Sequence, residues 1–182
     1  MRIDDYMRLF IAVKLSPELV DELVKTQIRM RCSGVKANYT RPENMHITLS
    51  FIGESDAEQA KNIENAFKNT SFNEFSLSLK GNGCFGSIYW IGTESGGELE
   101  KLALKIRSLL LTAKIPFDDK KFVSHITLSR ETYFPIKCKD ISSFTLNDNT
   151  SMKVNSFFLM KSERVNGKLI YNSIYEFKTG KI

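Results

Sequence analysis

The stretch His46-Ile47-Thr48-Leu49-Ser50 recurs unchanged at residues 125–129, 79 residues further along the chain. Two copies are too few for a solenoid, and they indicate two pseudo-equivalent halves that each carry one copy. The chain has 182 residues, which suffice for one compact domain or two small fused lobes. It contains two histidines, and each copy of the pentapeptide begins with one of them.

Each copy has the composition of a strand with one polar and one apolar face. Because successive side chains of a strand point to opposite faces, His and Thr are expected on one face and Ile and Leu on the other. The same alternation predicts Ser50 and Ser129 on the histidine face, and Phe51 on the apolar face. If the two halves face each other, four side chains converge across a cleft: His46, Thr48, His125 and Thr127.

That set of side chains suits phosphate chemistry. Histidine titrates near neutrality, so a pair can divide the work of general base and general acid. Threonine hydroxyls can hold phosphoryl oxygens and stabilise the charge that builds up in the transition state. Two histidines on separate strands without a third ligand make a poor zinc site, so no metal is expected. A single histidine on a strand is usually a surface or core residue, but the verbatim duplicate favours the catalytic interpretation.

The flanking sequence predicts alternating strands and helices. Ser16 and Pro17 are typical of a helix start, Ser55 and Glu58 form a capping box, and apolar spacing predicts a third helix over 98–113. Strands are predicted over residues 8–15, 45–53, 75–80, 87–92, 122–130, 152–162 and 169–177.

Two turns and one loop connect these predicted strands. Gly81-Asn82-Gly83 is predicted to turn the chain between the third and fourth strands, and Asn166-Gly167 between the last two. Residues 131–150 have the composition of a loop. Mixed strands, helices and hairpins favour an α+β fold.

Composition excludes several classes of protein. The chain is 42% hydrophobic and 26% charged, which is ordinary for a globular protein and excludes disorder. A net charge of +5 is compatible with an anionic partner. Cys32, Cys84 and Cys138 are widely spaced and odd in number, as expected for free thiols in a reducing compartment. Without a secretory signal or a long apolar segment, the protein is expected to be soluble, cytoplasmic, independent of membranes and monomeric.

Nearly the whole sequence resembles the 2H phosphoesterase superfamily, and most closely its LigT-like branch, the RNA 2′,3′-cyclic phosphodiesterases. The stretches that carry the resemblance are MRLFIAVKL (7–15), PENMHITLSFIGE (42–54), FSLSLKGNGCFGSIYWIG (75–92), FVSHITLSR (122–130) and VNSFFLMKSERVNGKLIYNSIYEF (154–177). The resemblance implies one domain over residues 1–182. It would contain two pseudo-symmetric α+β lobes with antiparallel sheets lining a central cleft and helices outside. Residues 1–6 precede the usual start of the family and are expected to be an N-terminal extension.

The resemblance also implies a reaction, in which water opens a 2′,3′-cyclic phosphate to leave a 2′-phosphomonoester without metal or cofactor. His46 would be the proton donor to the departing 3′-oxygen, and His125 the proton acceptor that activates water. Thr48 and Thr127 would bind phosphate oxygens, and Arg130 would contact the phosphate or ribose. Strict alternation places Arg130 on the face opposite His125, so it reaches the cleft only around a bulge or a strand end.

The expected partner is RNA with a 2′,3′-cyclic phosphate end, or a small cyclic nucleotide. Two alternatives stay open: 2′–5′ RNA ligase activity by the reverse reaction, and a non-catalytic RNA- or nucleotide-binding module of the same fold. Tyr39 and Phe85 could stack a nucleobase, although core packing or turn anchoring is favoured for both. Four further basic residues near the motifs could follow an RNA backbone or simply be solvated: Lys36, Arg41, Lys120 and Lys121.

Overall fold

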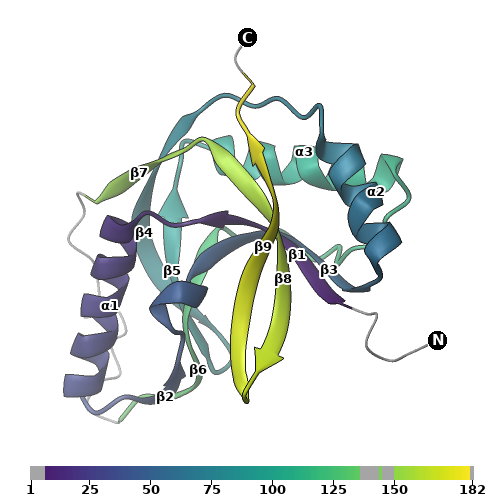
Figure 1. Cartoon of the computed structure of the whole chain (residues 1–182). Helices are drawn as coiled ribbons and strands as arrows, with labels where there is room; N and C mark the ends of the chain where they lie inside the picture. Colours follow the sequence, from purple (N-terminus) through teal and green to yellow (C-terminus); the bar gives the residue numbers. More distant parts are fainter. Residues whose placement is uncertain (1–6, 136–143, 145–149, 181–182) are drawn as a thin grey trace.

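Residues 7–135, 144 and 150–180 are described by a computed structural model of the chain (Figure 1). The expected extension at residues 1–6, Cys138 and most of the expected loop at 131–150 lie outside the described residues. Where that stretch is described, it begins as strand rather than loop, because the strand carrying the second motif continues to Tyr133.

One curved antiparallel sheet forms the centre of the described structure, with α-helices packed against it (Figure 1). The order of its strands is β7-β4-β5-β6-β3-β1-β8-β9, and β2 pairs with β6. The strands are β1 (Met7–Lys14), β2 (Lys36–Tyr39), β3 (His46–Ser55), β4 (Phe75–Phe85), β5 (Ile88–Glu94), β6 (His125–Tyr133), β7 (Ser151–Val154), β8 (Ser156–Val165) and β9 (Lys168–Lys178). The α-helices are α1 (Pro17–Cys32), α2 (Ala57–Phe67) and α3 (Glu98–Thr112), and a short 3-10 helix, η2 (Pro42–Asn44), precedes β3. The α+β class is confirmed, and the sheets of the two expected lobes are joined into one.

The junction between the two halves lies at the repeated pentapeptide. Strands β3 and β6 pair there through Ile47 and Ile126, which occupy the same position in the two copies. An antiparallel pair of equivalent residues places a local twofold axis between them. The same shift of 79 residues carries β1 and α1 to residues 86–93 and 96–111, close to the observed β5 and α3. The unit β1–α1–β3 is thus repeated as β5–α3–β6.

The helix of each half contacts the motif strand of the other half. From α1, the buried Gln27 side chain donates to the backbone oxygens of Thr40, at 2.7 Å, and Leu128, at 3.0 Å. Leu128 belongs to β6, the motif strand of the second half. Helix α3, which follows β5, packs against β3 of the first half. The two halves therefore share one hydrophobic core.

The starts of the helices agree only in part with the sequence prediction. Ser16 caps α1 as expected, with its side chain accepting from Leu19 N. The capping box at Ser55 is wrong, because Ser55 ends β3 and Asp56 caps α2 instead, accepting from Gln59 N at 2.7 Å. A carboxylate one residue later satisfies the same free N–H groups.

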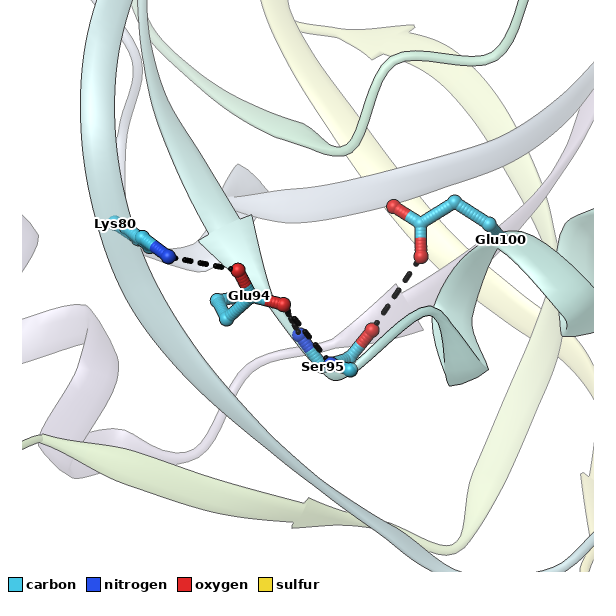
Figure 2. Close-up of polar contacts among 5 residues, drawn as sticks. Lys80, Glu94, Ser95 and Glu100 are labelled. Atoms are coloured by element: carbon cyan, nitrogen blue, oxygen red, sulfur yellow. Dashed lines mark hydrogen bonds and ion pairs between the residues drawn. The ribbon is translucent and has the colours of Figure 1, made fainter.

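Before α3, a short polar network fixes the path of the chain (Figure 2). The carboxylate of Glu94 accepts from the backbone N–H groups of Ser95 and Gly96 and from Lys80 Nζ at 2.9 Å. Ser95 Oγ in turn accepts from Leu99 N at 3.0 Å. Glu94 thereby fixes the turn before the helix, and Ser95 supplies an acceptor for one of the N–H groups that the first turn of a helix leaves free.

The predicted turn at Gly81-Asn82-Gly83 is wrong. These residues lie inside β4, where the pairing with β5 shifts between Leu79 and Asn82, and the chain turns at residues 86–87. Close approach explains two nearby glycines. A Cβ on Gly83 would lie 2.4 Å from the Trp90 ring, and one on Gly92 would lie 2.5 Å from Lys80 O.

The last hairpin is confirmed, with Asn166 and Gly167 both at positive φ in its turn. The predicted strand at 152–162 divides at Asn155 into β7, which pairs with β4, and β8, which pairs with β1 and β9. As a result, the C-terminal segment adds β7 to one edge of the sheet and β8 and β9 to the other. Of the helices that the structure describes, none combines the length and apolarity needed to cross a membrane.

Candidate active site

A bulge in each motif strand decides which side chains face the cleft. Ile11 and Ala12 of β1 pair with Ser50 and Thr48, so Leu49 is an extra residue in β3. In the second half, Tyr89 and Trp90 of β5 pair with Ser129 and Thr127, so Leu128 is extra in β6. An extra residue of this kind reverses the alternation of the faces beyond it.

The bulges correct three predictions from strict alternation. Ser50 and Ser129 are buried together with the preceding leucines, at 1% and 0% exposure, and do not share the histidine face. Phe51 lies on the cleft instead of the apolar face, and Arg130 reaches the cleft at the equivalent position of the second copy. The bulge therefore explains how Arg130 can join His125 on one side of the sheet.

The first histidine is held by its own backbone and by an aromatic pair. His46 Nδ1 lies 2.7 Å from the backbone oxygen of Asn44. Because a carbonyl oxygen only accepts, Nδ1 carries the proton, and Nε2 of the neutral ring accepts from the Thr48 hydroxyl at 3.0 Å. The rings of Phe10 and Tyr171 lie 5.0 and 5.1 Å from the imidazole. These contacts fix both the tautomer and the orientation of the ring.

Burial lowers the pKa of His46 to about 4, and the positive charges of His125 and Arg130 act in the same direction. The bond to Asn44 O opposes this shift without cancelling it. At neutral pH and without substrate, His46 is therefore a neutral imidazole.

The second histidine repeats the backbone contact of the first in a more open setting. His125 Nδ1 lies 2.7 Å from the backbone oxygen of Val123, two residues before it, as in the first copy. Its neutral ring therefore also has the proton on Nδ1, which leaves the Nε2 lone pair available. Phe85 and Trp90 lie edge-on to the imidazole, with ring centroids 5.2 and 6.1 Å away. The bond of His125 to its backbone is exposed, whereas that of His46 is partly buried.

All five predicted site residues line a single cleft of about 1020 Å³. They come from β3 and β6, and the register through Ile47 and Ile126 places His46 across from Thr127 and Thr48 across from His125. The twofold arrangement thus gives each histidine a threonine from the opposite strand as well as its own. The five residues are His46, Thr48, His125, Thr127 and Arg130.

Cationic side chains outnumber carboxylates along the cleft. Glu54 lies 3.5 Å from Arg8, and Glu163 lies 2.8 Å from Lys161. Arg130 has no ion-pair partner among the described residues, although it stands beside the histidines. The cationic lining residues are Arg8, Arg41, Arg130, Lys161 and Arg164. The cleft therefore suits an anion, with Arg130 available to bind it.

The sequence interpretation missed several residues that build the cleft. Phe10 and Tyr171 come from distant strands and had no motif to mark them. Of the other residues considered from the sequence, Tyr39 and Arg41 line the cleft, whereas Lys36, Lys120 and Lys121 do not. The sequence did contain a signal for Phe51. It occupies the position of the repeat at which the second copy has Arg130, and a position that holds a cationic residue in one copy is seldom part of a buried core. Within the described part of the chain, no three His, Cys, Asp or Glu side chains gather closely enough to hold a metal ion.

Comparisons with known sequences agree with this geometry. A family model described as "LigT like Phosphoesterase" matches residues 13–89. The chain is 36% identical over 165 residues to the RNA 2′,3′-cyclic phosphodiesterase of Archaeoglobus fulgidus, covering 86% of this chain and 91% of that protein. It is 29% identical over 177 residues to the RNA 2′,3′-cyclic phosphodiesterase of Thermotoga maritima, covering 93% and 94% of the two chains.

Solved structures show the same fold. Escherichia coli LigT complexed with 3′-AMP superposes with a TM-score of 0.81 at 22% identity, covering 98% of this chain and all of that one (100%). A protein from Thermus thermophilus superposes with a TM-score of 0.76 at 26% identity, covering 94% and 97% of the two chains.

Proposed function

Because this chain belongs to the LigT-like branch of the 2H phosphoesterases, we propose that it hydrolyses 2′,3′-cyclic phosphodiesters of RNA ends or nucleotides to 2′-phosphomonoesters. The curated relatives named above are RNA 2′,3′-cyclic phosphodiesterases. The observation that carries the proposal is the pair of equivalent histidines on one cleft, each with Nδ1 bound to a carbonyl oxygen two residues earlier.

In the proposed mechanism, His125 is the general base. With its proton held on Nδ1, its Nε2 accepts a proton from water, and the hydroxide so formed attacks phosphorus. The more open setting of His125 supports this role, because water reaches the ring from the solvent side. The attack must come in line with the departing 3′-oxygen, so the leaving group lies on the His46 side.

His46 is the general acid and must be protonated when the 3′-oxygen departs. Its pKa is lowered in the free protein, mainly by burial and in part by the charge of Arg130. A bound phosphodiester brings a negative charge that opposes the Arg130 charge and favours the imidazolium. Substrate binding is thus expected to favour protonation of His46. Thr48 and Thr127 donate to the non-bridging oxygens, and Arg130 neutralises their charge.

The proposed unit needs one chain and no cofactor. Every site residue comes from the same sheet, which supports a single domain acting as a monomer. The reaction transfers protons and a phosphoryl group without electron transfer, and the histidines and threonines supply the groups it requires.

A substrate panel tests the proposal. The purified protein is incubated with cyclic mononucleotides and with an RNA oligomer ending in a 2′,3′-cyclic phosphate, with and without EDTA, and products are separated as 2′- or 3′-phosphates. The expected product is the 2′-phosphate, at a rate that EDTA does not change. A 3′-phosphate product, or loss of activity in EDTA, would contradict the mechanism. Tight binding without turnover would favour a non-catalytic nucleotide-binding module.

A further inference from the structure

An exposed aromatic ring stands beside His125, at the end of β4 and outside the cleft lining. Phe85 is 42% exposed, and its ring centroid lies 5.2 Å from the His125 ring in an edge-on contact. Phe85 thus contacts the histidine, while much of its side chain stays in contact with solvent. Other apolar side chains are as exposed, but Phe85 combines its exposure with direct contact to His125.

The surrounding structure holds Phe85 in this place. Trp90 of β5 lies against it, with ring centroids 5.2 Å apart. Trp90 can lie close to β4 because residue 83 is glycine, where a Cβ would come within 2.4 Å of the indole. The shift in pairing between Leu79 and Asn82 sets the position of this end of β4. The exposed ring is therefore supported by two strands rather than carried on a loose side chain.

The two sides of the phosphorus face different surroundings. The cleft continues on the His46 side, where Phe10, Tyr171 and the β8–β9 hairpin add to its walls. That side has the space for the nucleoside that bears the cyclic phosphate. On the opposite side stand His125 and, beyond it, Phe85. In-line attack brings the nucleophile from this second side.

We propose that Phe85, supported by Trp90, is a stacking platform for the nucleobase of a second nucleoside, whose 5′-hydroxyl can replace water as the nucleophile. This inference rests on the proposed function and adds a second subsite to it. Flat aromatic rings bind nucleobases by stacking, with little dependence on sequence. A purine nucleoside has both a flat base for Phe85 and a hydroxyl for His125.

The transfer step balances without any co-reactant. The 5′-oxygen of the second nucleoside forms a bond to phosphorus while the bond from phosphorus to the 3′-oxygen breaks. The 5′-hydroxyl proton goes to His125 Nε2, and His46 gives a proton to the 3′-oxygen. The product is a 2′–5′ phosphodiester with a free 3′-hydroxyl, and the two histidines end with their protonation states exchanged.

Competition between nucleophiles tests the platform. Cytidine 2′,3′-cyclic phosphate is incubated with the protein and either adenosine or methanol, and the ratio of transfer to hydrolysis is measured for each. Methanol has a hydroxyl but no base. The variants are Phe85→Ala, Phe85→Leu, which keeps apolar bulk without a ring, and Phe85→Trp. Tyr133→Ala is the matched control, because Tyr133 is an aromatic side chain of 69% exposure that does not line the cleft.

Wild-type protein is expected to prefer adenosine to methanol, mole for mole. Phe85→Ala and Phe85→Leu should each reduce the adenosine ratio about tenfold or more and leave the methanol ratio unchanged. Phe85→Trp should retain the preference, and Tyr133→Ala should change neither ratio.

Other outcomes would overturn the inference. If Phe85 only supported His125, both ratios would stay constant while the overall rate fell, and the platform would be wrong. It would also be wrong if the wild type hydrolysed the ring without preferring adenosine. If the wild type opens no ring at all, the proposed function itself fails, and this inference falls with it.

Discussion

Phe51 and Arg130 occupy the same position in the two halves, five residues after His46 and His125, and both line the cleft. A bulge at the preceding leucine brings each of them to the histidine face. The repeat thus gives the site one aromatic and one cationic residue related by the local twofold. Under the proposed function, the anion of an asymmetric ligand is expected to bind nearer Arg130.

Replacement of Arg130 should weaken phosphate binding. We expect Arg130→Gln to raise KM more than it lowers kcat, and to raise the pKa of His46, because a nearby positive charge is removed. Arg130→Lys keeps the charge and should leave that pKa low. Histidine ring signals followed by NMR between pH 3 and 8 would measure it. An unchanged pKa in Arg130→Gln would show that Arg130 does not act on His46.

Each histidine should be required for turnover. His46→Ala and His125→Ala are each expected to lose about 10²–10⁴-fold in kcat for cyclic nucleotide hydrolysis. Thermal melting and circular dichroism should show that both variants remain folded. Near wild-type hydrolysis by either variant would rule out the two-histidine mechanism.

The hydroxyls of the motif threonines should be required for full kcat, whereas those of the motif serines should not. Thr48→Val and Thr127→Val each remove a donor from the phosphate and are expected to lower kcat by about 10²-fold or more. Ser50→Ala is the matched control, because the bulge buries Ser50 away from the cleft. An equal loss of activity in Ser50→Ala would contradict the assignment of faces.

Burial of His46 should make the protein less stable in acid. The pKa of His46 is about 4 in the folded protein and near the ordinary 6.5 when unfolded. As pH falls from 6.5 to 4, the unfolded state takes up a proton that the folded state does not. The free energy of unfolding should therefore decrease by an amount on the order of 3 kcal/mol. Urea unfolding of wild type and His46→Gln across this range measures the effect, and the variant should lack this contribution. Equal pH dependence in both would show that His46 is not the source.

Close backbone approach makes Gly92 sensitive to substitution. Gly92 pairs with His125, and a Cβ there would lie 2.5 Å from Lys80 O. Gly92→Ala should destabilise the fold by about 1–3 kcal/mol, since the backbone of β4 must shift. Gly180→Ala is the control, with its new Cβ at an ordinary 3.6 Å from Ser71. Chemical denaturation compares the two, and equal stabilities would mean that β4 moves aside freely.

The sequence predicted which side chains face the middle of the cleft better than those at its borders. Strand alternation correctly placed His46, Thr48, His125 and Thr127 on one face, because no irregularity separates each histidine from its threonine. It failed from residue 50 onward. A bulge is an extra residue in one strand relative to the strand it pairs with. The alternation of side chains within a single strand therefore cannot predict it.

Glycine was the other source of error. Gly81-Asn82-Gly83 has the composition of a turn, yet Gly83 is required by the indole of Trp90 within a continuing strand. The demand for a residue without a Cβ comes from the packing of another strand and not from local backbone conformation. The Asn166-Gly167 turn was predictable because its positive φ angles are a local requirement.

The exchange of α1 and α3 between the halves has a consequence for how the chain folds. Helix α3 packs against β3, and α1 bonds to β6 through Gln27, so a half released by cleavage between α2 and β4 would lose contacts that its motif strand makes with the other half. The two repeats must therefore form a single cooperative unit, and the unfolding transition should have one step despite the internal duplication. Contacts between residues about 100 positions apart, such as Gln27 with Leu128, also demand closure of long loops before either half gains its core. Folding is therefore expected to be slow and concerted, because the cleft forms only when both halves, each with one histidine, have come together.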